Sequence, residues 1–131
     1  MKQSTMSADY HLGMLHLVHL LVSADGVIDK NEIEAIRKLR QIENIPDQVF
    51  FDFQKSIINK RERDIYETGI RLINGCTDEE KLKTFVALYK ISEVDGHLHV
   101  KEVRLLLYSI KMANIEFDDV VKEAGKSPSI Q

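Results

Sequence analysis

The sequence repeats itself once, at a spacing of 70 residues. When the chain is shifted by that spacing, the two halves align without a gap, and Asp25 falls on Asp95. Asn44 likewise falls on Asn114. Apolar residues in both halves recur at the spacing of an amphipathic helix, and strand signals are weak. The repeat therefore predicts an all-α, pseudo-two-fold bundle in which a helix–acidic loop–helix unit occurs twice and each copy covers the apolar face of the other.

Seven helices are expected from the apolar periodicity and from the residues that start and stop helices. Thr77 and Glu80 form a capping-box pattern before the fifth helix, and Asp29 and Glu32 form another before the second. The first helix is apolar on most of its faces, so it should be deeply buried. The expected helices span about 7–22, 29–44, 46–57, 62–73, 77–94, 100–112 and 116–124. They fit a single domain, residues 1–131, with a core at about 7–124 and a frayed tail at 125–131.

Composition narrows the classes of protein to which this chain can belong. The net charge of −3 argues against nucleic-acid binding, which usually requires a basic face. The most apolar stretch, Leu12–Val22, is too short and too polar to span a membrane. The single cysteine, Cys76, rules out an intrachain disulfide and suits a reducing compartment. We therefore expect a cytoplasmic protein that neither binds nucleic acid nor inserts into a membrane.

Both copies of the repeat contain the pattern Asp-Gly-x-Ile/Leu-x-x-x-Glu between two expected helices. The glycine permits a sharp turn, and the aspartate can accept hydrogen bonds from amides just ahead of it. The glutamate falls in the first turn of the next helix, where the helix dipole favours a carboxylate. An EF-hand is excluded, because its first position needs a carboxylate and would be Leu21 or Ile91 here.

Two interpretations of these carboxylates remain open. In the first, the carboxylates only cap and brace the turns. In the second, they bind a divalent cation, because clustered carboxylates suit calcium, magnesium or manganese. The candidate ligands are Asp25, Asp29 and Glu32 in the first copy and Asp95 and Glu102 in the second.

The histidines offer weaker candidates for metal binding. His97 and His99 in the second acidic loop could supply nitrogen ligands for zinc or nickel, although histidines in a loop are more often simply exposed. His16 and His19 lie one turn apart, and we expect them on the polar edge of the first helix rather than on a metal.

The third helix carries more aromatic residues than one face can bury. Phe50, Phe53 and Ile57 are expected to point inward, so the adjacent Phe51 must lie elsewhere. Phe51 or Tyr66 could then reach the surface at a partner site, whereas packing against the fourth helix is the simpler alternative.

Motifs of catalysis are missing from the sequence: it has no nucleophile elbow, phosphate-binding glycine loop or zinc-finger spacing. We therefore expect a non-enzymatic binding module whose acidic loops bind a divalent cation or form a docking surface for protein partners. A purely structural protein–protein interaction domain is the alternative, and a metal-dependent hydrolase is third. The sequence does not determine an oligomeric state.

The two acidic segments resemble a known family. Residues 23–32, Ser-Ala-Asp-Gly-Val-Ile-Asp-Lys-Asn-Glu, follow an expected buried helix and resemble the hallmark motif of TerB-like (tellurite-resistance) proteins. Residues 93–102, Glu-Val-Asp-Gly-His-Leu-His-Val-Lys-Glu, look like its second copy. The resemblance covers roughly residues 7–124, and the first motif is more specific than the second.

This resemblance implies a seven-helix, pseudo-two-fold domain associated with tellurite resistance or a wider chemical-stress response. It also implies metal binding through acidic residues of the motifs, and protein partners that include membrane-linked assemblies. This chain departs from the co-chaperone members in having no J domain and no anchor, and it departs from an all-oxygen ligand set at His97 and His99. The positions that match the family motif are Asp25, Gly26, Glu32, Asp95, Gly96 and Glu102.

Overall fold

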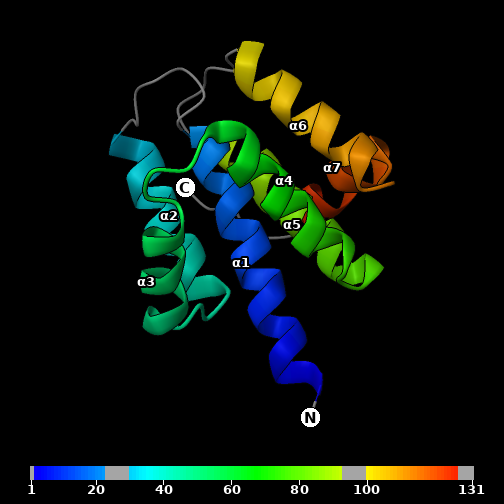
Figure 1. Cartoon of the computed structure of the whole chain (residues 1–131). Coiled ribbons are helices and arrows are strands. Elements are labelled where there is room, and N and C mark those ends of the chain that lie inside the picture. Colours follow the sequence, from blue (N-terminus) through cyan, green and yellow to red (C-terminus); the bar gives the residue numbers. More distant parts are fainter. Residues whose placement is uncertain (1, 23–29, 93–99, 127–131) are drawn as a thin grey trace.

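The computed structural model describes residues 2–22, 30–92 and 100–126, and this part of the chain is helical with short connecting turns (Figure 1). The expected all-α class is therefore confirmed for the described residues. Their helices are α1 (Lys2–Val22), α2 (Lys30–Ile42), α3 (Asp47–Ser56), α4 (Glu62–Asn74), α5 (Asp78–Ser92), α6 (Val100–Met112) and α7 (Phe117–Lys126).

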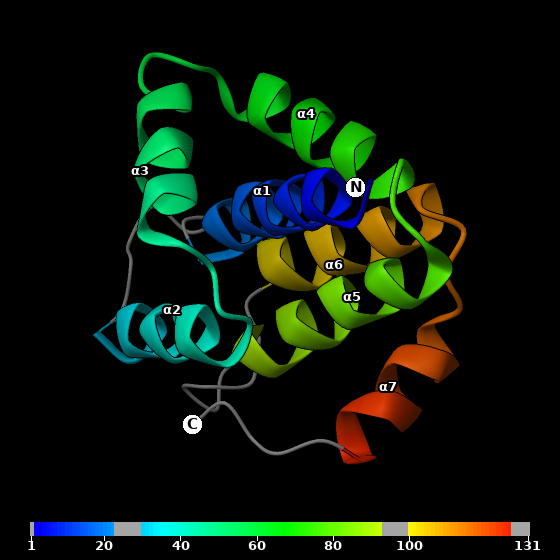
Figure 2. The same cartoon turned by 90° about the horizontal axis from the view of Figure 1, so that it is seen from below.

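Helix α1 lies at the centre of the molecule, with α3, α4, α5 and α6 packed around it (Figures 1 and 2). A helix that is enclosed in this way must be apolar on nearly all of its faces, which explains the run of leucines along it. The expectation that the first helix is deeply buried is confirmed. Its buried residues are Tyr10, Gly13, Met14, Leu15, His16, Leu17, Val18, Leu20, Leu21 and Val22.

Most helix ends lie within two residues of the expected bounds, and the two extensions beyond them at the ends of the bundle are those of α1 and α7. α1 begins at Lys2 rather than near Ser7, because the segment before Ser7 contains neither proline nor glycine and consists largely of residues that tolerate a helix. α7 continues to Lys126 rather than ending at Ala124, so Gly125 and Lys126 belong to the helix and not to the tail.

Local hydrogen bonds explain where α4 ends and α5 begins. The predicted capping box before α5 is confirmed: the Thr77 amide donates to the Glu80 carboxylate at 3.1 Å, and the Glu80 amide donates to Thr77 Oγ1 at 3.1 Å. α4 ends at Asn74, one residue beyond the expected end, but Gly75 has φ −84° and is not left-handed. The end of α4 therefore does not depend on the special conformations of glycine.

The helix ends repeat at the 70-residue spacing of the sequence repeat. α1 and α5 end at Val22 and Ser92, and α3 and α7 begin at Asp47 and Phe117. The bounds of α2 and α6 are separated by the same spacing at both ends. The starts of α1 and α5 do not share this spacing, since these helices begin at Lys2 and Asp78.

The turns after α2 and α6 are closed in the same way. Asn44 and Asn114 are both left-handed, with φ of 53° and 59°. The amide of Ile45 donates to the carbonyl of Arg40 at 3.0 Å, and the amide of Ile115 donates to that of Ile110 at 3.1 Å. Together with the asparagine amides, which bond three residues back, these contacts form a Schellman motif at each helix end.

Helix α3 is held against α1 by a small apolar cluster of its own. Phe53 is buried with Leu15 and Ile45, and burial of a phenylalanine contributes about 1.5–3 kcal/mol. Phe50 and Ile57 are half-buried against this cluster, so the inward face expected for the third helix is confirmed.

Candidate functional site

The predicted cation ligands fall largely outside the described residues. Asp25, Asp29 and Asp95 lie outside them, as do His97 and His99. Glu32 and Glu102 are in the first turns of α2 and α6, as predicted, but their side chains are not among those described. The capping box expected between Asp29 and Glu32 is outside the described part for the same reason. Over the side chains that the structure does describe, no three His, Cys, Asp or Glu residues come together as metal ligands.

The helix ends that flank the two acidic segments gather at one end of the molecule. α1 and α5 both end there, and α2 and α6 both begin there, at the top of Figure 1 and on the left of Figure 2. The two acidic segments therefore start and finish on the same side of the bundle.

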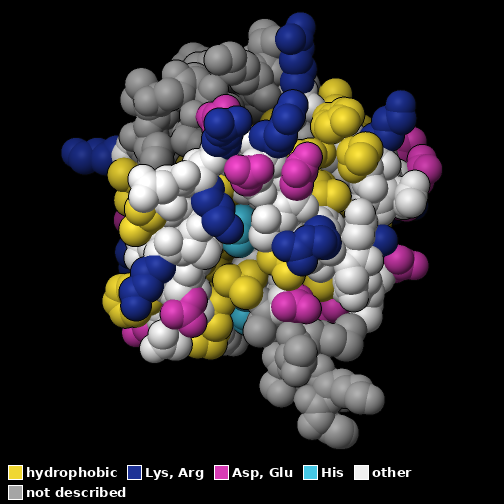
Figure 3. All heavy atoms as spheres, in the orientation of Figure 1, with side chains coloured by type: hydrophobic (Ala, Val, Ile, Leu, Met, Phe, Trp, Pro, Cys, Tyr) yellow, Lys and Arg dark blue, Asp and Glu magenta, His cyan; other side chains and the backbone are white. Residues whose placement is uncertain are grey.

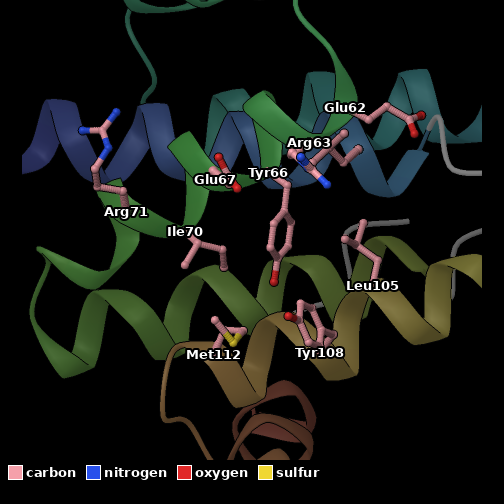
Figure 4. A pocket seen from close by; sticks show the side chains of 10 residues that line it. Glu62, Arg63, Tyr66, Glu67, Ile70, Arg71, Leu105, Tyr108 and Met112 are labelled. Carbon is pink, nitrogen blue, oxygen red and sulfur yellow. The ribbon is translucent and has the colours of Figure 1, made fainter.

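A groove of about 710 Å³ runs between α4 and α6, with α1 beneath it (Figure 4). Tyr66 and Ile70 extend from α4 toward α6, and Tyr108 and Met112 approach from the other side (Figure 4). The floor of the groove is completed by apolar residues of α1 and α6, Leu20 and Leu105. The groove is therefore an apolar trough between two helices.

Two residues on the α6 side of this groove are exposed although they are apolar. Tyr108 is 56% exposed and Met112 is 45% exposed. Figure 3 shows hydrophobic side chains gathered over α6, beside acidic and basic side chains over α4. A hydrophobic patch with a charged rim is typical of a surface that binds another molecule.

The rings of the two tyrosines in the groove stack on each other. The centroids of Tyr66 and Tyr108 are 5.9 Å apart, and the ring planes are 27° from parallel. The hydroxyls of Tyr66 and Ser109 are both buried near each other, and neither has another hydrogen-bond partner within the described part of the chain. Burial raises the pKa of Tyr66, and a hydrogen bond with the Ser109 hydroxyl opposes that rise. Tyr66 is therefore neutral at physiological pH.

The α4 edge of the groove is charged. Glu62, Arg63, Glu67 and Arg71 line it, and all four are exposed. Arg63, Glu67 and Arg71 are four residues apart, so they follow one another at about one helical turn along the same edge. None of these three makes an ion pair with another described residue. Their charges are therefore available to a partner.

A second hollow, of about 440 Å³, lies where α2, α5 and α7 meet. Leu39, Leu82 and Val86 line its apolar part. Its rim carries charges of both signs, and the Glu43 carboxylate there already accepts a hydrogen bond from Tyr10 Oη at 2.9 Å. This hollow also presents exposed apolar surface, since Ile42 in its lining is 57% exposed. The α4–α6 groove carries two such residues on one wall, Tyr108 and Met112.

The expectation that His16 marks a polar edge of α1 is wrong, because α1 is enclosed and has no polar edge at this position. His16 is only 3% exposed, and its Nδ1 donates to the Leu12 carbonyl at 2.7 Å. Its ring meets Phe53 edge to face, with centroids 4.9 Å apart, and His19 meets the same ring at 6.0 Å. Burial lowers the pKa of both histidines. His16 and His19 are therefore structural contacts of α1 with α3.

Cys76 is half-buried, and its thiol donates to the Leu72 carbonyl. Burial, with the nearby Glu80 carboxylate, raises its pKa to about 11. The thiolate is the reactive form of cysteine, so Cys76 is a poor nucleophile near neutral pH.

None of the helices in the described ranges is long and apolar enough to cross a membrane. No protein-family model, curated protein or solved structure matches this chain.

The sequence pointed to Tyr66 but missed the groove. Tyr66 was one of two aromatic residues that could reach a partner site, with core packing as the simpler alternative, and it lies half-buried in the groove wall. Phe51, the other, is 57% exposed on α3 and does not line the groove. The signal that could have found the α6 wall is the run of apolar residues at 105–108, which is too long for one buried face.

Proposed function

We propose that this chain is a non-enzymatic binding module and that the α4–α6 groove is its docking surface for a protein partner. The observation that carries the proposal is the pair of exposed apolar residues, Tyr108 and Met112, beside an apolar trough with a charged edge. Interfaces between proteins commonly have an apolar, aromatic centre with a polar rim.

A retention experiment tests this proposal with a matched control. The tagged chain, its Met112→Glu variant and its Phe51→Glu variant are used to retain proteins from an extract of the source cells. Met112 and Phe51 are both exposed apolar residues on helices, but only Met112 lines the groove. We expect proteins that are retained by the unaltered chain and by Phe51→Glu but lost with Met112→Glu. Identical sets of retained proteins for all three would contradict the proposal.

We also propose that the two halves are copies of one unit, and that the chain is TerB-like, as its acidic motifs suggest. Support comes from the helix bounds that recur at 70 residues and from the left-handed Asn44 and Asn114 at equivalent ends. The packing is also reciprocal, because α2 contacts α5 of the other half and α6 contacts α1. Superposition of residues 10–22 and 30–50 on residues 80–92 and 100–120 in an experimental structure tests the duplication, and failure of the helix pairs to coincide would refute it.

A divalent-cation site in the acidic segments is a second candidate function. Its support is that the helix ends flanking both segments gather at one end of the molecule, which would allow Asp25, Asp29 and Glu32 to act with Asp95 and Glu102. Calcium, magnesium or manganese would suit such a set of oxygen ligands.

Calorimetric titration separates a cation site from simple helix capping. Under the cation proposal, Asp25→Ala and Glu32→Ala each abolish saturable binding, whereas the control Asp118→Ala, at an exposed first-turn aspartate of α7, leaves it unchanged. No heat with any of the three ions, together with a loss of about 1 kcal/mol of stability in the first two variants, would support capping instead.

A further inference from the structure

We infer that the α4–α6 groove binds an amphipathic helix of another protein, whose flanking charges alternate acid, base, acid at intervals of one helical turn. This inference rests on the proposed function, since it names the kind of partner that the groove accepts.

The walls of the groove favour a helix over an extended peptide. Both walls are helices, so their backbone amides and carbonyls are already paired within α4 and α6. An extended peptide over this apolar floor would leave its own N–H and C=O groups without partners, which costs free energy. A helical partner satisfies its own backbone groups and presents only side chains to the groove.

The charged edge of α4 sets the pattern of the partner. Arg63, Glu67 and Arg71 give the sequence of charges plus, minus, plus at intervals of four residues. A partner helix that lies along the groove repeats its own side chains at the same interval, so acid, base and acid would meet these three in turn. Each exposed pair contributes little alone, but three pairs in one register discriminate between partners.

The same edge also indicates how much of the partner is recognised. Arg63 and Arg71 are eight residues apart, which is about 12 Å along a helix. About nine residues of a partner helix cover this length, with apolar side chains packing on Ile70, Tyr108 and Met112. The charge pattern reads the same in both directions, so it selects a register but not an orientation.

A second copy of this chain is a poorer occupant. If two α4 helices crossed antiparallel about Glu67, each Glu67 would face its own copy, and Arg63 would face Arg71. Like charges in contact across an interface are unfavourable. The alternation on α4 therefore favours a different chain that carries the opposite pattern.

Two labelled, designed helical peptides of about 16 residues test the inference, since shorter isolated helices are marginally stable. They share one apolar face; one carries Glu, Lys, Glu along the edge, and the other carries Lys, Glu, Lys. By fluorescence anisotropy with the full chain, we expect the first to bind roughly tenfold more tightly, with the difference shrinking as salt is added. The triple variant Arg63→Glu, Glu67→Lys, Arg71→Glu, altered only at exposed positions, should reverse the preference.

The controls separate failure of this inference from failure of the proposed function. Met112→Glu should abolish binding of both peptides, whereas Phe51→Glu should change neither. Equal binding of the two peptides, lost with Met112→Glu, would overturn the charge pattern while leaving the groove as a docking surface. Binding of neither peptide would overturn the helical partner, and the retention experiment then decides the proposed function alone. Self-association that disappears with Met112→Glu would assign the groove to a second copy and contradict the inference.

Discussion

Gly13 of α1 lies directly against Ile73 of α4. A methyl group in place of its hydrogen would come within 2.7 Å of Ile73 Cδ1 and 3.2 Å of Leu72 Cβ. Gly69 of α4 is similarly close to α1, since an added Cβ would lie 3.0 Å from His16 Cβ. The two glycines allow the α1 and α4 backbones to approach closely, which places α4 where it forms one wall of the groove.

Gly13→Ala should therefore destabilise the protein, although alanine favours a helix more than glycine does. Ile73 is fully buried and cannot move aside freely, so we expect a loss of about 1–3 kcal/mol in the free energy of unfolding. The matched control is Gly125→Ala, because an added Cβ there meets nothing within 4 Å. Urea unfolding of both variants checks this, and equal stability of Gly13→Ala and the unaltered protein would contradict the close approach.

The left-handed turns after α2 and α6 should respond alike to substitution. Asn44→Ala and Asn114→Ala should each lower stability by about 1–2 kcal/mol, because alanine is strained at positive φ. Asn44→Gly and Asn114→Gly should lose little, since glycine is the preferred residue at this position of the motif. Chemical unfolding of the four variants measures this, and a loss at only one of the two turns would argue against equivalent helix ends.

The buried hydroxyl of Tyr66 gives a contrast with that of Tyr10. Tyr66→Phe should change the free energy of unfolding by less than about 1 kcal/mol, because the Tyr66 hydroxyl has no partner besides the neutral Ser109 hydroxyl. Tyr10→Phe should instead lower it by about 1.5–3 kcal/mol, because the Tyr10 hydroxyl donates to the Glu43 carboxylate at 2.9 Å. Thermal or urea unfolding compares the two variants, and similar losses in both would contradict this difference between the two hydroxyls.

Stability should fall as the pH drops below about 6.5, the ordinary pKa of histidine. Burial lowers the pKa of His16 in the folded protein, against the hydrogen bond to the Leu12 carbonyl, which raises it, and the charges of Lys60 and Arg71 lower it further. Burial also lowers the pKa of His19, against the opposing charge of Glu62. The unfolded chain then binds more protons than the folded one. The contribution of these two histidines to the free energy of unfolding is therefore fully present above pH 6.5. It decreases as the pH falls toward their pKa values in the folded protein.

The free energy of unfolding can fall by about 1.4 kcal/mol per pH unit because of His16. The fall caused by the more exposed His19 should be smaller. Urea unfolding at intervals from pH 7 to pH 5 measures the effect. The variant His16→Gln should show a flatter profile than the unaltered protein, because it lacks the titrating group. If the stability of His16→Gln depends on pH as steeply as that of the unaltered protein, a group other than His16 is responsible for the pH dependence.

Local signals in the sequence predicted the helices well. Thr77 and Glu80 cap α5 by contacts within four residues, and Pro46 precedes α3 with a φ of −62° that suits proline. Such contacts can be recognised without knowing which helices meet. The extension of α1 back to Lys2 was not predicted because Ser7 is a residue type that commonly caps a helix, although the segment before it contains no stop signal.

The groove and the burial of His16 were not predictable, because both depend on which helices meet. His16 is buried only because α3 and α4 cover the side of α1 on which it lies, as shown by its contacts with Phe53 and Gly69. Tyr66 and Tyr108 are far apart in the sequence, and nothing local indicates that their rings stack. The sequence did identify the acidic segments, whose loop residues lie outside the described part of the chain, so the cation site stays a prediction.

Site-specific photo-crosslinking tests the docking surface most directly. A photoreactive phenylalanine replaces Tyr108 in the groove or, as a control, Phe51 on α3, and the chain is irradiated in its source cells. Both positions are exposed to a similar extent, at 56% and 57%. We predict a discrete adduct with a second protein from position 108 that is absent from position 51 and is lost when Met112→Glu is added. Adducts of equal yield from both positions, or none from position 108, would contradict the assignment of the groove.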